Sequence, residues 1–106
     1  MNNYQEEIKQ FCIYPGAGTG NKDALVYTAL EMTGEAGEYA EKIKKYVRVG
    51  VLESSLVANE LGDVLFAVAR AATELNMTLE DIASMNLDKL YSRKKRGVLG
   101  GNGDER

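Results

Sequence analysis

Residues 31–63 read EMTGEAGEYAEKIKKYVRVGVLESSLVANELGD, and this stretch decides the fold and holds the main candidate site. It carries two pairs of acidic residues with a spacing of three, Glu35 with Glu38 and Glu60 with Asp63. Residues three apart on a helix lie on one face, on neighbouring turns. Each pair therefore directs two carboxylates to the same side of an expected helix.

Each acidic pair borders the apolar stripe of its helix. At about 100° per residue, with Glu35 at zero, Glu38 falls at about 300° and the apolar residues fall between roughly 40° and roughly 100°. With Glu60 at zero on the third helix, Asp63 also falls at about 300°, and the apolar residues fall between roughly 40° and roughly 120°. If the two stripes pack together as an antiparallel hairpin, four carboxylates converge at the edge of a shared core.

Four convergent carboxylates repel one another, and at least one would be expected to take up a proton. A hard divalent cation removes that conflict, and all-carboxylate oxygen ligands suit magnesium, with manganese as a substitute. The competing interpretation is a solvated helix face, because acid pairs at this spacing are common on exposed helices. The occurrence of two such pairs on adjacent segments favours the metal site.

The composition predicts one small domain over residues 1–106. The chain is 44% hydrophobic and 27% charged, and its modest core makes self-association reasonable. A net charge of −3 gives no reason to expect nucleic-acid binding. The sequence has neither a signal-peptide pattern nor an apolar run long enough to span a bilayer, so we expect no membrane partner and a cytoplasmic location. The single cysteine, Cys12, excludes an internal disulfide.

The chain contains no histidine. This excludes Ser-His-Asp and Cys-His catalysis, zinc sites with histidine ligands, and di-iron bundles of the Glu-x-x-His type. The remaining chemistry must use carboxylates, amines, guanidinium groups or hydroxyls, with or without a metal ion.

Apolar spacing predicts an all-α fold, a small bundle of about four helices without strands. The first helix is expected at residues 4–14, before a glycine-rich connector that completes an N-terminal segment over residues 1–23. In this connector, Gly16, Gly18 and Gly20 fit a plain linker better than a phosphate cradle, because no strand precedes them. Residues 97–106 form a glycine-rich C-terminal tail.

The boundaries of the other three helices follow from capping residues. The second should run from about Asp23 to Tyr46 or Val47, with Asn21 or Asp23 as its cap. Ser54 or Ser55 should cap the third, which ends near Leu75. Thr78 is expected at the N-cap of the fourth, with Asp81 at its third position.

The fourth helix carries an amide and two cations on one stripe. At the angular spacing of a helix, Asn86, Lys89 and Arg93 all fall close to the direction of Ile82. This stripe is either a solvated basic face or an anion-binding surface that faces the acidic site through metal and phosphate.

These motifs, in this order and spacing, resemble the MazG-type nucleoside triphosphate pyrophosphohydrolases of the all-α NTP pyrophosphatase group. The resemblance covers roughly residues 24–106 and includes the Leu61-Gly62-Asp63-Val64-Leu65 stretch around the second acidic pair. The sequence RKKRG at residues 93–97, with the glycine-rich end, is similar to compact members that are often phage-borne.

The resemblance implies metal-dependent hydrolysis of a nucleoside triphosphate to the monophosphate and pyrophosphate. It implies homodimers or homotetramers, in which a second chain completes the bundle. The magnesium ligands that it implies are Glu35, Glu38, Glu60 and Asp63. One carboxylate, Glu35 or Glu38, would accept a proton from the attacking water. The residues that it implies for substrate contact are Asn86, Lys89 and Arg93.

Two other functions remain open at this stage. A dUTP-specific diphosphatase of the same fold group would use the same carboxylates and would also accept dUDP. A non-catalytic helical interaction module would keep the bundle and lose turnover, although the presence of all four expected ligands argues against it.

Overall fold

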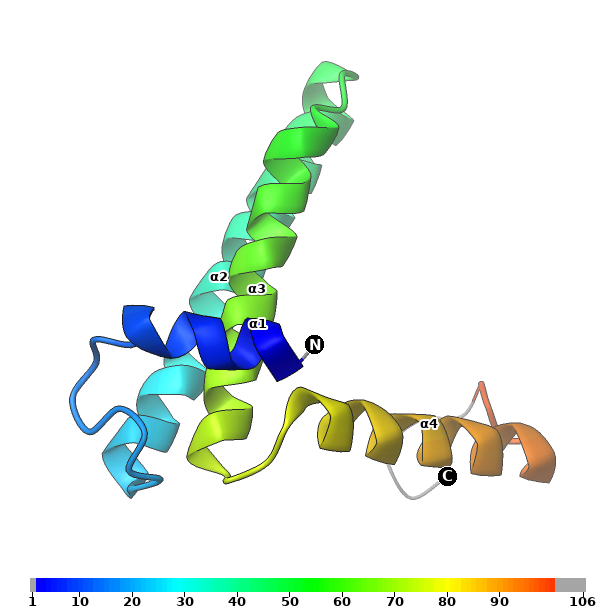
Figure 1. Ribbon diagram of the computed structural model, residues 1–106. Coiled ribbons are helices and arrows are strands. Elements are labelled where there is room, and N and C mark those ends of the chain that lie inside the picture. Colours follow the sequence, from blue (N-terminus) through cyan, green and yellow to red (C-terminus); the bar gives the residue numbers. More distant parts are fainter. Residues whose placement is uncertain (1, 101–106) are drawn as a thin grey trace.

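The computed structural model describes residues 2–100, and all regular secondary structure within them is helical (Figure 1). The predicted all-α class is therefore confirmed for this part of the chain. Residues 101–106 of the predicted tail lie outside the described residues. The elements are α1 (Asn2–Glu7), the 3-10 helix η1 (Ile8–Phe11), α2 (Lys22–Val49), α3 (Ser54–Glu74) and α4 (Leu79–Arg96).

The longest helices, α2 and α3, form the antiparallel hairpin that the two apolar stripes predicted (Figure 1). The predicted cap of α2 is confirmed, because Asn21 Oδ1 accepts a hydrogen bond of 2.8 Å from Ala24 N–H. The helix continues slightly beyond the predicted end and stops at Gly50, which adopts the left-handed conformation with φ +83°. A helix C-terminus commonly ends on such a glycine.

The predicted cap of α3 is wrong. Ser54 and Ser55 both lie inside the helix, and the N-cap position is Glu53, which makes no capping hydrogen bond with its side chain. The predicted cap of α4 is confirmed: Thr78 Oγ1 accepts from Asp81 N–H, and Thr78 N–H donates to Asp81 Oδ2, both at 3.0 Å. This reciprocal capping box fixes the first turn of α4.

Helices α1 and η1 lie across the base of the hairpin, near the turn between α3 and α4 (Figure 1). Gln5 ties these parts together: its Nε2 donates to Thr73 Oγ1 at 3.0 Å and to Met77 O at 2.9 Å. Its Oε1 accepts from Leu79 N–H at 2.9 Å. The small apolar core beside it consists of Ile8, Ala69, Ala72 and Leu79.

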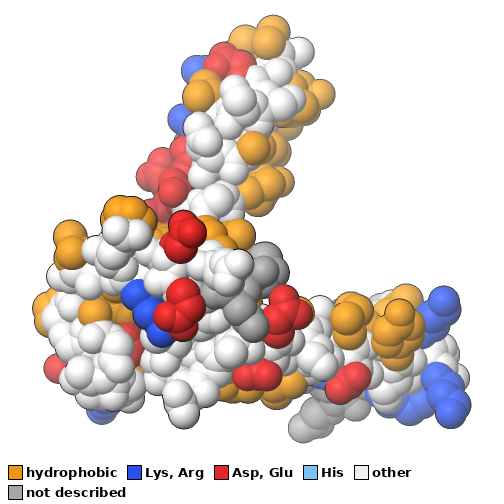
Figure 2. All heavy atoms as spheres, viewed as in Figure 1, with side chains coloured by type: hydrophobic (Ala, Val, Ile, Leu, Met, Phe, Trp, Pro, Cys, Tyr) orange, Lys and Arg blue, Asp and Glu red, His pale blue; other side chains and the backbone are white. Residues whose placement is uncertain are grey.

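Helix α4 leaves this base and extends sideways from the hairpin, so the chain is open in shape (Figure 1). The turn before it contains Asn76 with φ +57°, a left-handed conformation that asparagine tolerates better than most residues. Many large apolar side chains of the helices stay exposed to solvent. Figure 2 shows them in orange along both the hairpin and α4. Among the described residues, no helix is long and apolar enough to cross a membrane.

Candidate metal and nucleotide site

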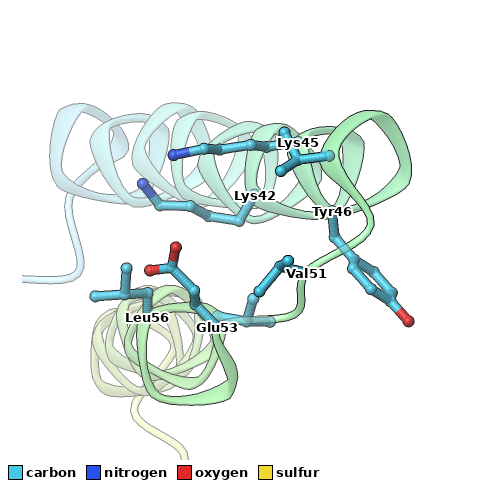
Figure 3. Close-up of a pocket in the computed structure, with 8 residues that line it drawn as sticks. Lys42, Lys45, Tyr46, Val51, Glu53 and Leu56 are labelled. Atoms are coloured by element: carbon cyan, nitrogen blue, oxygen red, sulfur yellow. The ribbon is translucent and has the colours of Figure 1, made fainter.

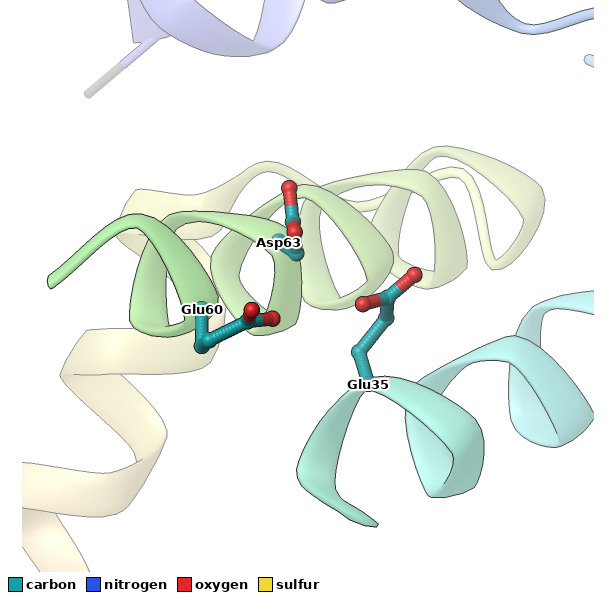
Figure 4. A group of neighbouring side chains, drawn as sticks. All are labelled: Glu35, Glu60 and Asp63. Carbon is teal, nitrogen blue, oxygen red and sulfur yellow. The ribbon is translucent and has the colours of Figure 1, made fainter. Parts of the chain in front are cut away.

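Three of the four predicted carboxylates converge between α2 and α3. Glu35 comes from α2, and Glu60 and Asp63 come from α3; each offers one oxygen, and these oxygens all lie within 4.8 Å of one another (Figure 4). Glu35 and Glu60 are partly buried, whereas Asp63 is exposed. The hairpin packing thus brings together side chains that are far apart in sequence.

The electrostatics of this group centre on Glu35. Burial raises the pKa of Glu35, and the negative charges of Asp63, Glu31, Glu60 and Glu38, in that order, raise it further. A carboxyl group in this position is protonated more readily than in water unless a cation compensates the surrounding charge. The protein therefore holds several carboxylates in mutual repulsion at one place, which is the pattern that a cation would relieve.

Glu38 does not belong to this three-oxygen group. It lies one turn after Glu35 on α2, is exposed to solvent and acts on Glu35 through its charge. Tyr4 of α1 approaches the group from α1: burial raises its pKa first, and the charge of Asp63 raises it further. Helix α1 therefore lies near enough to the acidic group for the charge of Asp63 to act on Tyr4.

The three residues predicted to contact substrate do not share one surface. Asn86 and Lys89 line a hollow on α4 together with Ile82 and Met85, and this hollow contains none of the three carboxylates. Arg93 is only 5% exposed and interacts with other residues of the chain. The structure thus brings Asn86 and Lys89 together and leaves Arg93 out of their hollow.

The sequence interpretation missed a second set of charged residues. Arg70, its partner Glu31 and Glu74 lie on the same two helices as the three converging carboxylates. Arg70 of α3 donates from Nη1 to the carboxylate of Glu31, one helical turn before Glu35. Its guanidinium carbon lies 4.7 Å from the ring centre of Tyr14 and 4.3 Å from that of Phe66. Such stacking on aromatic faces stabilises a guanidinium group.

Glu74, one turn after Arg70, is the anchor of the glycine-rich connector. Its carboxylate accepts hydrogen bonds from Gly18 N–H and Gly20 N–H, both at 2.8 Å, and from the Tyr14 hydroxyl. Burial alone would raise the pKa of Glu74, but these three donors outweigh it and hold the pKa below its ordinary value. The connector therefore directs its backbone donors to an internal carboxylate, in agreement with a linker.

A sequence signal for this second set did exist. Arg70 and Glu74 are charged residues inside the stretch AVARAATE at positions 67–74, which is otherwise made of small and mostly apolar residues. Charged residues in such a stretch are rarely buried unless they are paired. The signal predicts buried partners, although it does not identify them.

The comparison with known proteins finds a matching family and a relative. Residues 26–98 match the family described as MazG nucleotide pyrophosphohydrolase domain. The chain is also 42% identical, over 109 aligned positions, to the Gene 37 protein of Mycobacterium phage L5, and the match covers 97% of this chain and 96% of the phage protein. No solved structure matches the chain.

Proposed function

The chain belongs to the MazG nucleotide pyrophosphohydrolase domain family, and we propose that it hydrolyses a nucleoside triphosphate to the monophosphate and pyrophosphate with Mg²⁺ or Mn²⁺. The single observation that supports this most is the convergence of Glu35, Glu60 and Asp63 between α2 and α3. Exposed acidic groups are common, but these three come from two different helices, α2 and α3, of the segment that matches the family.

The donor set fits a hard divalent cation. It offers carboxylate oxygens alone, without sulfur or nitrogen, and such oxygens suit magnesium and manganese. Glu35, Glu60 and Asp63 would hold the ion. The chemistry that it supplies when bound is compensation of phosphate charge and a lower pKa for a water molecule.

The proposed roles of the protein's own residues follow from their positions. Glu38 is one turn from Glu35 but outside the three-oxygen group, so its carboxylate is available to accept the proton of the attacking water. The water oxygen would form a bond to phosphorus while the bond between the α and β phosphates breaks, and pyrophosphate leaves. Asn86 and Lys89 would contact the nucleotide from their hollow, because an amide and a cation suit base edges and phosphates.

We also propose that a second copy of the chain completes the site. The Cα radius of gyration is 16.3 Å, whereas a compact domain of this length has about 13 Å. Large apolar side chains stay exposed, including Leu30 at 69%, Val47 at 79% and Tyr91 at 69%. A second copy would cover these faces and bring its α4 hollow against the carboxylates.

The tip of the hairpin offers another surface of this kind. A hollow there is lined by residues from both helices and the loop, among them Lys42, Tyr46, Val51 and Leu56 (Figure 3). Val49 and Val51 in this hollow are more than half exposed in the single chain. Sedimentation equilibrium across a range of concentrations tests the proposed self-association, and a monomer throughout would contradict it.

The activity is tested with a panel of ribo- and deoxyribonucleoside triphosphates, and dUDP, in the presence of Mg²⁺. The released phosphate species is identified as pyrophosphate or orthophosphate, and an EDTA sample serves as the control. The matched variants are Glu60→Gln, which removes a proposed ligand, and Glu80→Gln, which changes an exposed acid on α4.

We expect pyrophosphate release that requires the metal, is lost in Glu60→Gln and persists in Glu80→Gln. Orthophosphate as the first product would contradict the proposed cleavage position. Turnover of dUTP and dUDP alone would assign the chain to the diphosphatase alternative. Absence of turnover on the whole panel would favour the non-catalytic module.

A further inference from the structure

The ion pair between Glu31 and Arg70 lies directly beside the proposed metal group. Glu31 is on α2, four residues before Glu35, and Arg70 is on α3, seven residues after Asp63. The side chain of Arg70 is 5% exposed and that of Glu31 is 22% exposed. An ion pair this buried carries a desolvation penalty and gives little net stability on average. Its position therefore calls for an explanation other than stability.

Arg70 is held in one orientation. The rings of Tyr14 and Phe66 contact its guanidinium group, and the Cys12 side chain also interacts with it. Its Nε atom is buried without a hydrogen-bond partner among the described residues, whereas Nη1 donates to Glu31. The aromatic contacts fix the guanidinium plane and point it at Glu31.

Glu31 lies beside the metal group, but its carboxylate does not belong to it. Residues four apart on a helix lie on the same face, so Glu31 and Glu35 both project toward α3. The negative charge of Glu31 acts on Glu35, yet the three oxygens that converge belong to Glu35, Glu60 and Asp63. The Glu31 carboxylate is turned instead to Arg70.

We propose that Arg70 is a positioning residue that keeps Glu31 out of the metal group and so leaves coordination positions open for substrate phosphates. This inference rests on the proposed function. Magnesium at nucleotide sites keeps coordination positions for water and phosphate oxygens, and the three proposed carboxylates already take up part of its coordination sphere. A further carboxylate one turn away would compete with those phosphates and bind the ion more tightly. The ring-clamped guanidinium prevents this by pairing with Glu31.

The first test measures Mn²⁺ binding by isothermal titration calorimetry, together with kcat, in the full chain and in Arg70→Met. Methionine keeps much of the arginine stem and removes the charge, so packing is largely preserved. We expect Mn²⁺ affinity to rise about 10-fold and kcat to fall about 10-fold, the scale of changes in groups that surround metal ligands. In the double variant Glu31→Gln with Arg70→Met, Mn²⁺ affinity should return to within about 2-fold of wild type.

A merely structural Arg70 predicts a different result. Unchanged or weaker Mn²⁺ binding in folded Arg70→Met, with the wild type binding normally, would overturn the inference and leave the proposed function intact. A wild type that does not bind Mn²⁺, or a Glu60→Gln variant that binds it equally well, would overturn the proposed function and the inference together.

The single variant Glu31→Gln provides an arm that does not depend on the folding of Arg70→Met. The glutamine amide oxygen can still accept the hydrogen bond from Arg70. If Glu31 is held outside the metal group, the Mn²⁺ affinity of the Glu31→Gln variant should stay within about 3-fold of wild type, because no ligand is lost. A loss of more than about 10-fold would identify Glu31 as a ligand and overturn the inference.

Discussion

The same hairpin contains two groups of acidic residues whose surroundings are opposite. Glu31 and Glu74 have partners within the chain: Arg70 for the first, and Tyr14 with two backbone N–H groups for the second. In the other group, Glu35, Glu60 and Asp63 face one another, with their oxygens within 4.8 Å. The first group is compensated by donors inside the protein, whereas the second gathers like charges.

The pKa shifts of the two groups differ in direction as their surroundings do. The pKa of Glu74 lies below its ordinary value because three donors outweigh burial, and that of Glu35 lies above its ordinary value because burial and four negative neighbours act together. A carboxylate with internal donors contributes to the fold, whereas repelling carboxylates destabilise it and are candidates for a binding site.

The largest effect is expected from Glu60→Gln. Loss of a proposed ligand should reduce turnover by more than the roughly 10–100-fold that follows loss of a group outside the ligand set. The free energy of unfolding without metal should stay equal or rise, because one repelling charge is removed. Steady-state kinetics measures the turnover, and urea unfolding measures the free energy of unfolding. A destabilised Glu60→Gln with normal turnover would show that Glu60 serves the fold and not the proposed metal site.

Glu74→Ala should have the opposite profile. It leaves two N–H groups and the Tyr14 hydroxyl without their acceptor, which should reduce the free energy of unfolding by about 3 kcal/mol. Metal affinity of the remaining folded protein should change little, because Glu74 does not belong to the three-carboxylate group. Urea unfolding checks the first expectation, and exposed Glu7 changed to Ala is the matched control.

The pH dependence of stability sharpens the same point. The folded-state pKa of Glu74 lies below the ordinary value of 4.5. The unfolded chain therefore takes up this proton first, so the stabilisation is complete above about pH 4.5 and is lost as the pH falls through the folded-state pKa. The free energy of unfolding, measured from about pH 6 down to about pH 3, should fall less steeply in Glu74→Ala than in the wild type. Equal slopes would show that Glu74 does not carry this dependence.

Metal addition should stabilise the folded protein only where the group of repelling carboxylates is intact. At a free Mn²⁺ concentration of about 100 times Kd, binding to the folded state adds about 2.7 kcal/mol. For a domain of this size, that corresponds to a rise in Tm of about 10–20 °C. Calorimetry should find this rise in the wild type and in Glu74→Gln, and a much smaller one in Glu60→Gln. An equal rise in all three would indicate binding elsewhere.

The smallest effect concerns the connector that Glu74 holds. Gly18 and Gly20 both have positive φ, so alanine at either should cost about 1–2 kcal/mol. A Cβ at Gly20 would also lie 2.9 Å from the Glu74 carbonyl oxygen, whereas a Cβ at Gly18 meets no atom within 4 Å. Gly20→Ala should therefore be less stable than Gly18→Ala by about 1 kcal/mol or more. Equal losses in urea unfolding would contradict the close approach.

The helices could be predicted from sequence because their signals are local. Apolar spacing predicted the hairpin, and the caps at Asn21 and Thr78 followed from side chains that bond within their own turn. The start of α3 was missed because two adjacent serines looked like caps, while the helix already begins directly after Glu53. The convergence of the three carboxylates followed from the hairpin and the acid spacing.

The remainder depends on interactions between distant residues. Pairing of Glu31 with Arg70 requires the register of the hairpin, and the direction of α4 depends on the turn that contains Asn76. Arg93 is buried, whereas its place on the stripe of α4 predicted either a solvated basic face or an anion-binding surface. The roles of the predicted ligands and of the α4 hollow stay predictions until the variants are measured.

The hydrogen bonds of Gln5 have a consequence for the order of events during synthesis. They join the first helix to residues that follow 68 to 74 positions later. At about 5–20 residues per second, a ribosome needs roughly 3–15 s to make the intervening chain. Helix α1 is therefore made well before its partners and can dock only after they follow, and until then the base of the hairpin lacks its cover.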